Sequence, residues 1–310
     1  MRHSRVQFWL YALLFYTLLV ILWGAWVRVS FSGDGCGTSW PLCHGQVIPK
    51  GADGKTWTEL FHRITSGIYG LIVLGLFSWS HLSKKARDGL SSEFRFWTKL
   101  ALFFTITEAL LGAKIVLFGL VADNDSVFRS ISMALHFMNS AILVACVCKC
   151  AFFAGAPQWQ KRSLTDFERS LCRTSIWVLG FFFIMGATGT VAALSNTLYP
   201  ADHLLQAIME DFHPDSHFLV KLRGLHPSLG LIGGAVLLTY SWQLIDSQRD
   251  HRLYRNHAIF LLLIFTNILV GAFTILLKAP LILKIMHLVL AYGIWIWWLR
   301  LRHELKNTAQ

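Results

Sequence analysis

Long runs of hydrophobic residues, separated by short polar segments, make up most of this 310-residue chain. A helix that crosses a bilayer needs ~20 mostly apolar residues, and eight segments approach that length. They are residues 8–28, 64–82, 99–120, 132–154, 174–194, 225–244, 258–277 and 282–300. The pattern predicts an all-α membrane protein with eight transmembrane helices.

The two halves of this pattern resemble each other. Glu108-Ala-Leu-Leu-Gly-Ala in the third segment is echoed by Asn267-Ile-Leu-Val-Gly-Ala in the seventh. Parallel repeats related about the membrane normal are a known way to build membrane proteins. We therefore expect two similar four-helix bundles, an N-terminal half at 1–154 and a C-terminal half at 174–310. A basic linker at 155–173 joins them.

Composition supports the membrane interpretation. The chain is 55% hydrophobic and only 15% charged, with a mean hydropathy of +0.51, whereas soluble domains are about a quarter charged. The net charge of +11 is compatible with a nucleic acid partner. However, the basic residues lie in short segments between apolar runs, as in loops that fix membrane orientation. We expect a lipid bilayer as the partner and no nucleic acid.

The Lys and Arg residues also predict which side each loop faces. They gather at both termini and at 84–99, 161–173 and 249–255, and basic loops stay in the cytoplasm. Both termini are therefore expected to be cytoplasmic, and the long loops 29–61 and 195–223 to face outward. The first apolar run is too long for a signal peptide and no small-residue cleavage site follows it, so we expect a retained span.

Four of the 13 histidines lie at or just inside predicted spans. His62, His136, His226 and His287 are placed near the outward-facing starts of the second, fourth, sixth and eighth spans. A histidine inside a span is costly and usually functional. A single one would more often bond to water or backbone, but equivalent placement in two repeats favours ligands.

Imidazole binds several metals, and zinc sites normally recruit Cys, Asp or Glu as well. The predicted helix interiors supply few carboxylates, notably Glu108. Two imidazoles from facing helices instead suit the iron of a six-coordinate heme inside a four-helix bundle. Nearby glycines would admit the flat ring or merely allow close helix packing; they are Gly67, Gly70, Gly112, Gly230, Gly233 and Gly271. Heme propionates could pair with Arg28, Arg63, Arg129 and Arg223.

Cys36 and Cys43 lie in the first long loop, separated by six residues that include Gly and Pro. This spacing permits a disulfide in an oxidising outer compartment. The bridge could be structural or could act as a redox or maturation switch. Cys146, Cys148 and Cys150 do not share a helix face, so buried small hydrophobes are the better interpretation.

Glu59 precedes His62 by three residues and therefore shares its helix face. It could be a first-turn carboxylate favoured by the helix dipole. It could also be a polar group at the heme edge that moves protons or stabilises a cationic intermediate.

Three segments carry a resemblance to a known family. They are Trp40-Pro-Leu-Cys43-His-Gly, Glu59-x-x-His62-Arg63, and Asp211-Phe-His-Pro-Asp-Ser-His217-Phe-Leu-Val-Lys-Leu-Arg223-Gly-Leu-His226-Pro. Together with the four regularly placed histidines, they make the chain similar to the heme A synthases over nearly its whole length.

The resemblance implies the following roles. The C-terminal half would hold a heme b through His226 and His287, and the N-terminal half would bind the substrate heme O near His62 and His136. Glu59 matches the essential carboxylate of the family, and Cys36 with Cys43 matches its first-loop cysteine pair. The reaction oxidises a porphyrin methyl group to a formyl group through successive hydroxylations, giving heme A for cytochrome oxidase assembly.

The same resemblance implies a location and partners. The protein would lie in a bacterial inner cell membrane, with its active-site loops on the outer face. Its partners would be heme O synthase, terminal oxidase subunits and an electron acceptor or donor that the sequence does not identify. A homo-oligomer is compatible with the sequence. Some relatives carry a second cysteine pair, which residues 195–223 lack.

Two rival functions use the same features. A diheme b-type cytochrome that takes electrons from quinol also needs paired membrane histidines, but Glu59 and the loop cysteines favour the synthase. A heme transporter or delivery protein would be expected to carry charge at the midplane of the membrane, where this chain has little.

Overall fold

The computed structural model describes residues 2–155, 166–247 and 251–308, and within these ranges the chain is helical, with no strand. It divides into two compact units, residues 1–157 and 158–310.

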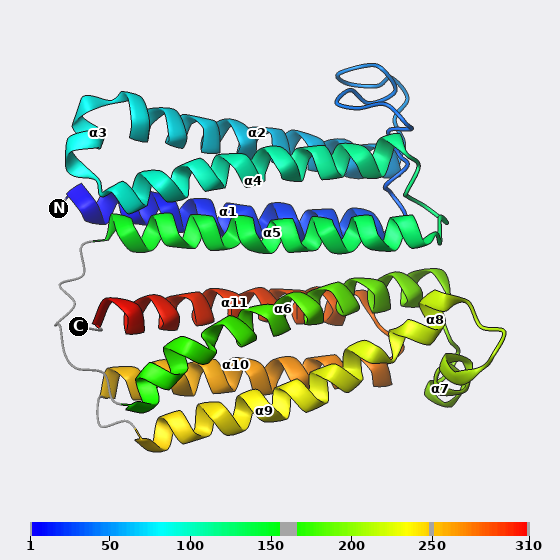
Figure 1. Ribbon diagram of the computed structural model, residues 1–310. Coiled ribbons are helices and arrows are strands. Elements are labelled where there is room, and N and C mark those ends of the chain that lie inside the picture. Colours follow the sequence, from blue (N-terminus) through cyan, green and yellow to red (C-terminus); the bar gives the residue numbers. More distant parts are fainter. Residues whose placement is uncertain (1, 156–165, 248–250, 309–310) are drawn as a thin grey trace. The chain divides into compact units, whose positions relative to one another are not determined.

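The first unit contains four long helices and one short one (Figure 1). They are α1 (Arg2–Val29), α2 (Gly54–Leu82), the short α3 (Lys84–Gly89), α4 (Ser92–Leu117) and α5 (Val127–Ala154). Helix α1 packs beside α2 and α5, and α4 packs beside the same two helices. The unit is therefore a four-helix bundle in which α1 and α4 each contact both α2 and α5.

Helix α2 begins ten residues earlier than its hydrophobic run predicts. Asp53 caps the helix by accepting a hydrogen bond from the Thr56 backbone N–H at 2.8 Å, and this bond lowers the pKa of the Asp53 carboxyl. The first turns that follow are polar, so hydropathy does not detect them. As a result His62 lies two turns inside α2 rather than at its start.

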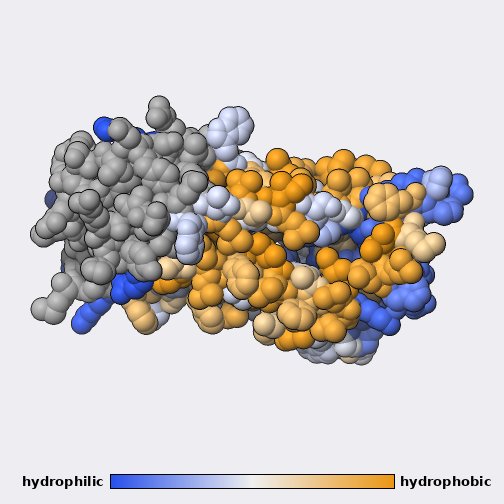
Figure 2. Space-filling model, turned by 90° about the horizontal axis from the view of Figure 1, so that it is seen from below, coloured by the Kyte–Doolittle hydropathy of each residue, from blue (hydrophilic) through white to orange (hydrophobic). Residues whose placement is uncertain are grey.

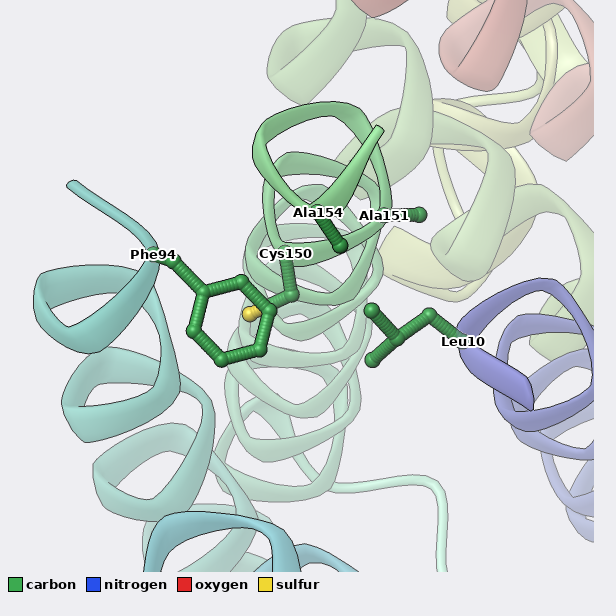
Figure 3. Packing of buried hydrophobic residues seen from close by; sticks show 5 residues of the cluster. All are labelled: Leu10, Phe94, Cys150, Ala151 and Ala154. Atoms are coloured by element: carbon green, nitrogen blue, oxygen red, sulfur yellow. The ribbon is translucent and has the colours of Figure 1, made fainter. Parts of the chain in front are cut away.

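A small core holds the first unit together at the end where α1 begins. Leu10 of α1, Phe94 of α4 and Cys150, Ala151 and Ala154 of α5 are all buried there (Figure 3). The alanines let the helix backbones approach closely around the Phe94 ring, as is common for small residues between membrane helices. This packing leaves the other end of the bundle free to carry the long loop at residues 30–53.

The second unit repeats the arrangement of long helices, with two short helices added. It comprises α6 (Asp166–Leu198), α7 (Leu204–Phe212), α8 (Phe218–Arg223), α9 (Leu225–Ser247), α10 (His251–Leu276) and α11 (Leu281–Thr308). The segment 195–223, predicted from the sequence to be a long loop, is largely helical. Its nine-residue α7 is too short to register as a hydrophobic span.

Seven helices in the described residues are long and apolar enough to cross a membrane: α1, α2, α4, α5, α6, α10 and α11. Helix α9 coincides with the remaining predicted span, but several of its side chains fall outside the described residues, so the count of eight stays a prediction. On the face seen in Figure 2, hydrophobic residues cover the coloured part, and hydrophilic residues gather at the end where Figure 1 draws α7 and α8. The chain is an all-α, multi-pass membrane protein.

Candidate functional site

In the first unit, each predicted ligand histidine lies against a glycine of the preceding long helix. A Cβ atom built on Gly24 of α1 would lie 3.0 Å from Cε1 of His62 and 3.2 Å from its Nε2. A Cβ on Gly112 of α4 would lie 4.0 Å from Cε1 of His136. The first contact leaves no room for a larger residue, whereas the second is an ordinary van der Waals contact.

The second unit repeats this arrangement more tightly. A Cβ on Gly189 of α6 would come within 2.9 Å of Cε1 of His226, and one on Gly271 of α10 within 3.0 Å of Cε1 of His287. The two imidazole rings face each other with their centroids 5.9 Å apart and their planes at 87°. All four histidines thus pack against a glycine, and the contacts of His62, His226 and His287 are so close that a Cβ on that glycine would push the ring aside.

In the second unit, Nδ1 of each histidine lies near an oxygen atom of a neighbouring helix. Nδ1 of His287 lies 3.2 Å from the carbonyl oxygen of Asn267, and the His226 imidazole bonds to the backbone of Met185, with Thr188 Oγ1 3.4 Å from Nδ1. When Nδ1 carries the proton, Nε2 is the nitrogen that can bind a metal. Each ring would then present Nε2 as its metal-binding nitrogen.

This spacing fits a heme iron. Two imidazoles bound to opposite sides of one metal, at about 2.0 Å per bond, place their ring centroids roughly 6 Å apart. The measured separation of 5.9 Å agrees with that value. Within the described ranges no cluster of three or more His, Cys, Asp and Glu side chains forms a site for a metal ion. A heme, whose porphyrin already binds the iron, would need only the two histidine nitrogens from the protein.

The first unit differs in what surrounds the histidine pair. Nδ1 of His62 is buried and has no hydrogen-bond partner among the described residues. Nδ1 of His136 lies 3.3 Å from Oε2 of Glu108, without the alignment of a completed hydrogen bond. The first pair is thus less firmly held by the protein than the second.

Glu59 is buried in α2 and fastens the long loop to that helix. One carboxylate oxygen accepts the backbone N–H of Cys36 at 2.8 Å, and the other pairs with Arg63 at 2.5 Å. Arg63 in turn donates to the carbonyl oxygens of Ser39 and Leu42, both at 2.7 Å. The acid is therefore held in one position, directly beside the disulfide loop.

A disulfide between Cys36 and Cys43 cross-links the loop. Both cysteines pack against Leu60 of α2. The backbone of Gly35 approaches the start of α2 so closely that a Cβ there would lie 2.5 Å from the carbonyl of Lys55. Only glycine fits this contact. The bridge and the glycine together place the Cys36 N–H where Glu59 can accept it.

The four predicted propionate partners fall into two kinds. Arg63 and Arg223 already form hydrogen bonds and ion pairs with loop residues and helix ends. Arg223 pairs with Asp211 at 2.6 Å and with Glu210 at 3.3 Å. Burial raises the pKa of the Asp211 carboxyl, while the Arg223 guanidinium opposes that rise.

Arg28 and Arg129 are the other kind. Nε of each is buried and lacks a hydrogen-bond partner in the part of the chain that the structure describes. The two side chains are near enough to repel each other, although Arg129 also donates to the carbonyl oxygens of Ala122 and Asn124. Two guanidinium groups this close are suited to bind an anion, and of the two Arg129 is already influenced by the carboxylates of Asp123 and Asp125.

The two units carry opposite charge at the same sequence position. Glu59 lies three residues before His62, and Arg223 lies three residues before His226. The residue three places before the first histidine is thus an acid in the first unit and a base in the second, and each is paired with an opposite charge, Arg63 or Asp211.

Comparison with known proteins bears on this site. The sequence model of the COX15-CtaA family, described as cytochrome oxidase assembly protein, matches residues 7–299. The chain belongs to this family. The resemblance to heme A synthases is thereby confirmed, since curated relatives in the comparison carry that name.

Three relatives illustrate what this chain is similar to. A protoheme IX farnesyltransferase of Thermus thermophilus is 36% identical over 296 residues, covering 94% of this chain and 47% of that protein. Heme A synthase of Shouchella clausii is 40% identical over 146 residues, 46% of this chain and 44% of that one. Heme A synthase of an Exiguobacterium species is 33% identical over 143 residues, with the same coverage. The match spans about half the length of these relatives.

Sequence reasoning missed two of the glycines that seat histidines in this family member. It named Gly112 and Gly271 but not Gly24 and Gly189. Its other four glycines do not touch the histidines in the structure: Gly67 faces open space, and Gly70, Gly230 and Gly233 face Thr105, Met185 and Phe181. An alignment of α1 with α6 across the two halves could have revealed Gly24 and Gly189, because each occupies the late part of the first long helix.

Proposed function

We propose that this protein is a heme A synthase, which oxidises one methyl group of heme O to the formyl group of heme A. The observation that carries the proposal is the packing of a histidine against a glycine four times in two repeated units, with Glu59 three residues before His62 in the first unit and Arg223 at that place in the second. The family match and the relatives named heme A synthase support the same function.

In this proposal the second unit holds a resident heme b through His226 and His287. When bound, this heme would supply one-electron transfer at its iron. The 5.9 Å spacing of the two rings supports this assignment. The backbone contacts of the two imidazoles, with Asn267 and Met185, hold both rings in place.

The first unit binds the substrate heme O, between His62 and His136. Conversion of the methyl to a formyl group adds one oxygen, taken from water, and releases four electrons and four protons. The four electrons pass to a redox acceptor that is separate from this protein. Glu59 can accept a proton from the attacking water, and its negative charge can stabilise positive charge on the ring as electrons leave. Its bonds to Cys36 and Arg63 keep the carboxylate in place for both roles.

The order of features along α1 supports placing the substrate there. An apolar groove of about 470 Å³ lies between the first part of α1 and α2, with Leu10, Leu13 and Tyr16 in its wall. Gly24 follows against His62, and Arg28 comes one turn later. An apolar tail, a ring and carboxylates occur in that order in a heme that carries an isoprenoid chain. The groove would then take the farnesyl tail and Arg28 with Arg129 the propionates.

We further propose eight spans with both termini in the cytoplasm, in a bacterial inner membrane. The distribution of Lys and Arg supports this orientation. The disulfide loop and the site would then face outward, where an oxidising compartment favours the Cys36–Cys43 bridge.

One relative's name bears on partners. The Thermus protein is called a protoheme IX farnesyltransferase, and this chain matches 47% of it. Farnesylation of protoheme yields the substrate that a heme A synthase consumes. We propose that an enzyme with that activity supplies the substrate here, and that terminal oxidase subunits receive the product.

The test is co-expression with a source of heme O, followed by chromatography of the extracted hemes. Heme A should accumulate with the intact chain and should be absent with His62→Ala. The diheme b-type cytochrome remains the second candidate, because the two histidine pairs are so alike. Bound heme without any heme A would support that candidate.

A further inference from the structure

The carboxylate of Glu108 lies inside α4, in a segment apolar enough to cross a membrane. Its oxygens accept hydrogen bonds from Nδ2 of Asn139, at 2.6 Å, and from the hydroxyl of Ser140. The remaining near neighbour is Nδ1 of His136, 3.3 Å from Oε2. An ionisable group at such a position is expensive and usually functional. Neither the disulfide loop nor Glu59 accounts for it.

The network around Glu108 is held from both helices. Asn139 also donates to the carbonyl oxygen of Phe104 at 2.9 Å, and the hydroxyl of Thr107 donates to Oδ1 of Asn139 at 2.7 Å. These bonds fix Asn139, which in turn fixes the Glu108 carboxylate. The acid is therefore positioned before any ligand arrives, with one edge directed at the imidazole.

The second unit has no carboxylate at the corresponding place. Glu108 stands four residues before Gly112, and Asn267 stands four residues before Gly271. There the backbone carbonyl oxygen of Asn267, not a side-chain acid, faces Nδ1 of His287. The two proposed iron sites thus differ in the group that faces Nδ1 of one ligand histidine. It is the Glu108 carboxylate for His136 and a backbone carbonyl oxygen for His287.

We propose that Glu108 is a positioning residue that accepts the Nδ1–H of His136, directs Nε2 to the iron and makes this ligand more electron-rich than those of the second unit. The inference rests on the proposed function, which puts an iron porphyrin between His62 and His136. A carboxylate behind a ligand histidine fixes the tautomer and raises the basicity of the nitrogen that binds the metal. A small turn of the imidazole closes the 3.3 Å contact into a hydrogen bond. An electron-rich ligand stabilises ferric over ferrous iron at this site.

The test uses the full chain carrying His287→Ala, so that added hemin occupies the first unit alone. Hemin affinity is measured by absorbance titration, and the midpoint potential by optical redox titration. Glu108→Gln should weaken hemin binding about tenfold. It should also raise the ferrous fraction, and a tenfold change in the ferrous-to-ferric ratio corresponds to 59 mV for one electron.

Thr105→Val is the matched control, because it removes a hydroxyl of the same helix that donates to the carbonyl oxygen of Ala101 and takes no part in the Glu108 network. Both quantities should stay at the His287→Ala values in this variant. Unchanged values in Glu108→Gln would overturn the proposal, and so would an equal change in Thr105→Val. If Glu108→Gln binds no hemin, Glu108→Asp decides: its retracted carboxylate should give a raised potential, and an unchanged potential would refute the role.

These outcomes are separable from those of the proposed function. If the chain without any substitution forms no heme A, the proposed function fails while the hemin titrations still report on Glu108. If that chain forms heme A and Glu108→Gln leaves hemin affinity and potential unchanged, only the role of Glu108 fails.

Discussion

At the scale of single residues, glycine sets how closely His62, His226 and His287 approach the neighbouring helix. Gly189 and Gly271 admit the rings of His226 and His287 so closely that a methyl group would displace them. Glu59 acts at the same scale in the other unit, since its position depends on one backbone N–H and one guanidinium. Both cases can be tested by replacing a single side chain.

Gly189→Ala should lower heme occupancy of the second unit, because the new Cβ would meet Cε1 of His226 at 2.9 Å. Misdirecting a ligand in this way typically costs ~10-fold in affinity or more. Gly180→Ala in the same helix is the control, since a Cβ there meets nothing within 4 Å. Heme content per protein, from absorbance of the purified variants, measures the effect. Equal heme loss in both variants would contradict the seating role.

Glu59→Gln should retain bound heme yet reduce heme A formation by at least ~100-fold, the usual range for loss of an acid or base group. The amide can still accept the Cys36 N–H, so the loop is expected to stay attached. Arg63→Gln breaks the same ion pair but keeps the carboxylate. Comparison of heme A yields separates the two effects. Full activity in Glu59→Gln would remove this acid from the mechanism.

At the scale of helices, the sequence predicted the long apolar segments well, because bilayer crossing requires uninterrupted hydrophobic runs. It did not predict where α2 begins, since the turns after Asp53 are polar and stabilised by a cap and by the loop. It treated the residues of α7 and α8 as a loop because both helices are short.

The pairing of histidines with glycines lies beyond what helical periodicity can provide. The contacts of His62 with Gly24 and of His226 with Gly189 join different helices. Their residues are distant in sequence, so only packing brings them together. The same holds for Glu108, which the sequence marked as an interior acid without revealing that His136 is its neighbour.

The groove between α1 and α2 gives a prediction at this scale. Ala12→Trp fills the groove and should weaken binding of heme O several-fold while leaving protoheme, which has no farnesyl tail, unaffected. Leu19→Trp, also exposed on α1 but outside the groove wall, is the control. Titration of each heme into the purified variants measures the difference. An equal loss for both hemes in Ala12→Trp would exclude the groove as the tail site.

At the scale of the whole molecule, two units with the same order of long helices carry the same histidine and glycine contacts but different charged neighbours. Glu108 lies beside His136, and Glu59, Arg28 and Arg129 belong to the same unit. Backbone groups contact the second pair, and the Arg223 cluster belongs to the second unit. The repeat supports two heme sites, and the charged residues support a division between a substrate site and a resident one.

The most direct test of this division is chromatography of hemes extracted from cells that make heme O and express either the intact chain, Glu59→Gln or His62→Ala. The account predicts heme A with the intact chain only, with heme b still present in the Glu59→Gln protein. Heme A in all three cultures, or in none while heme b remains bound throughout, would contradict it.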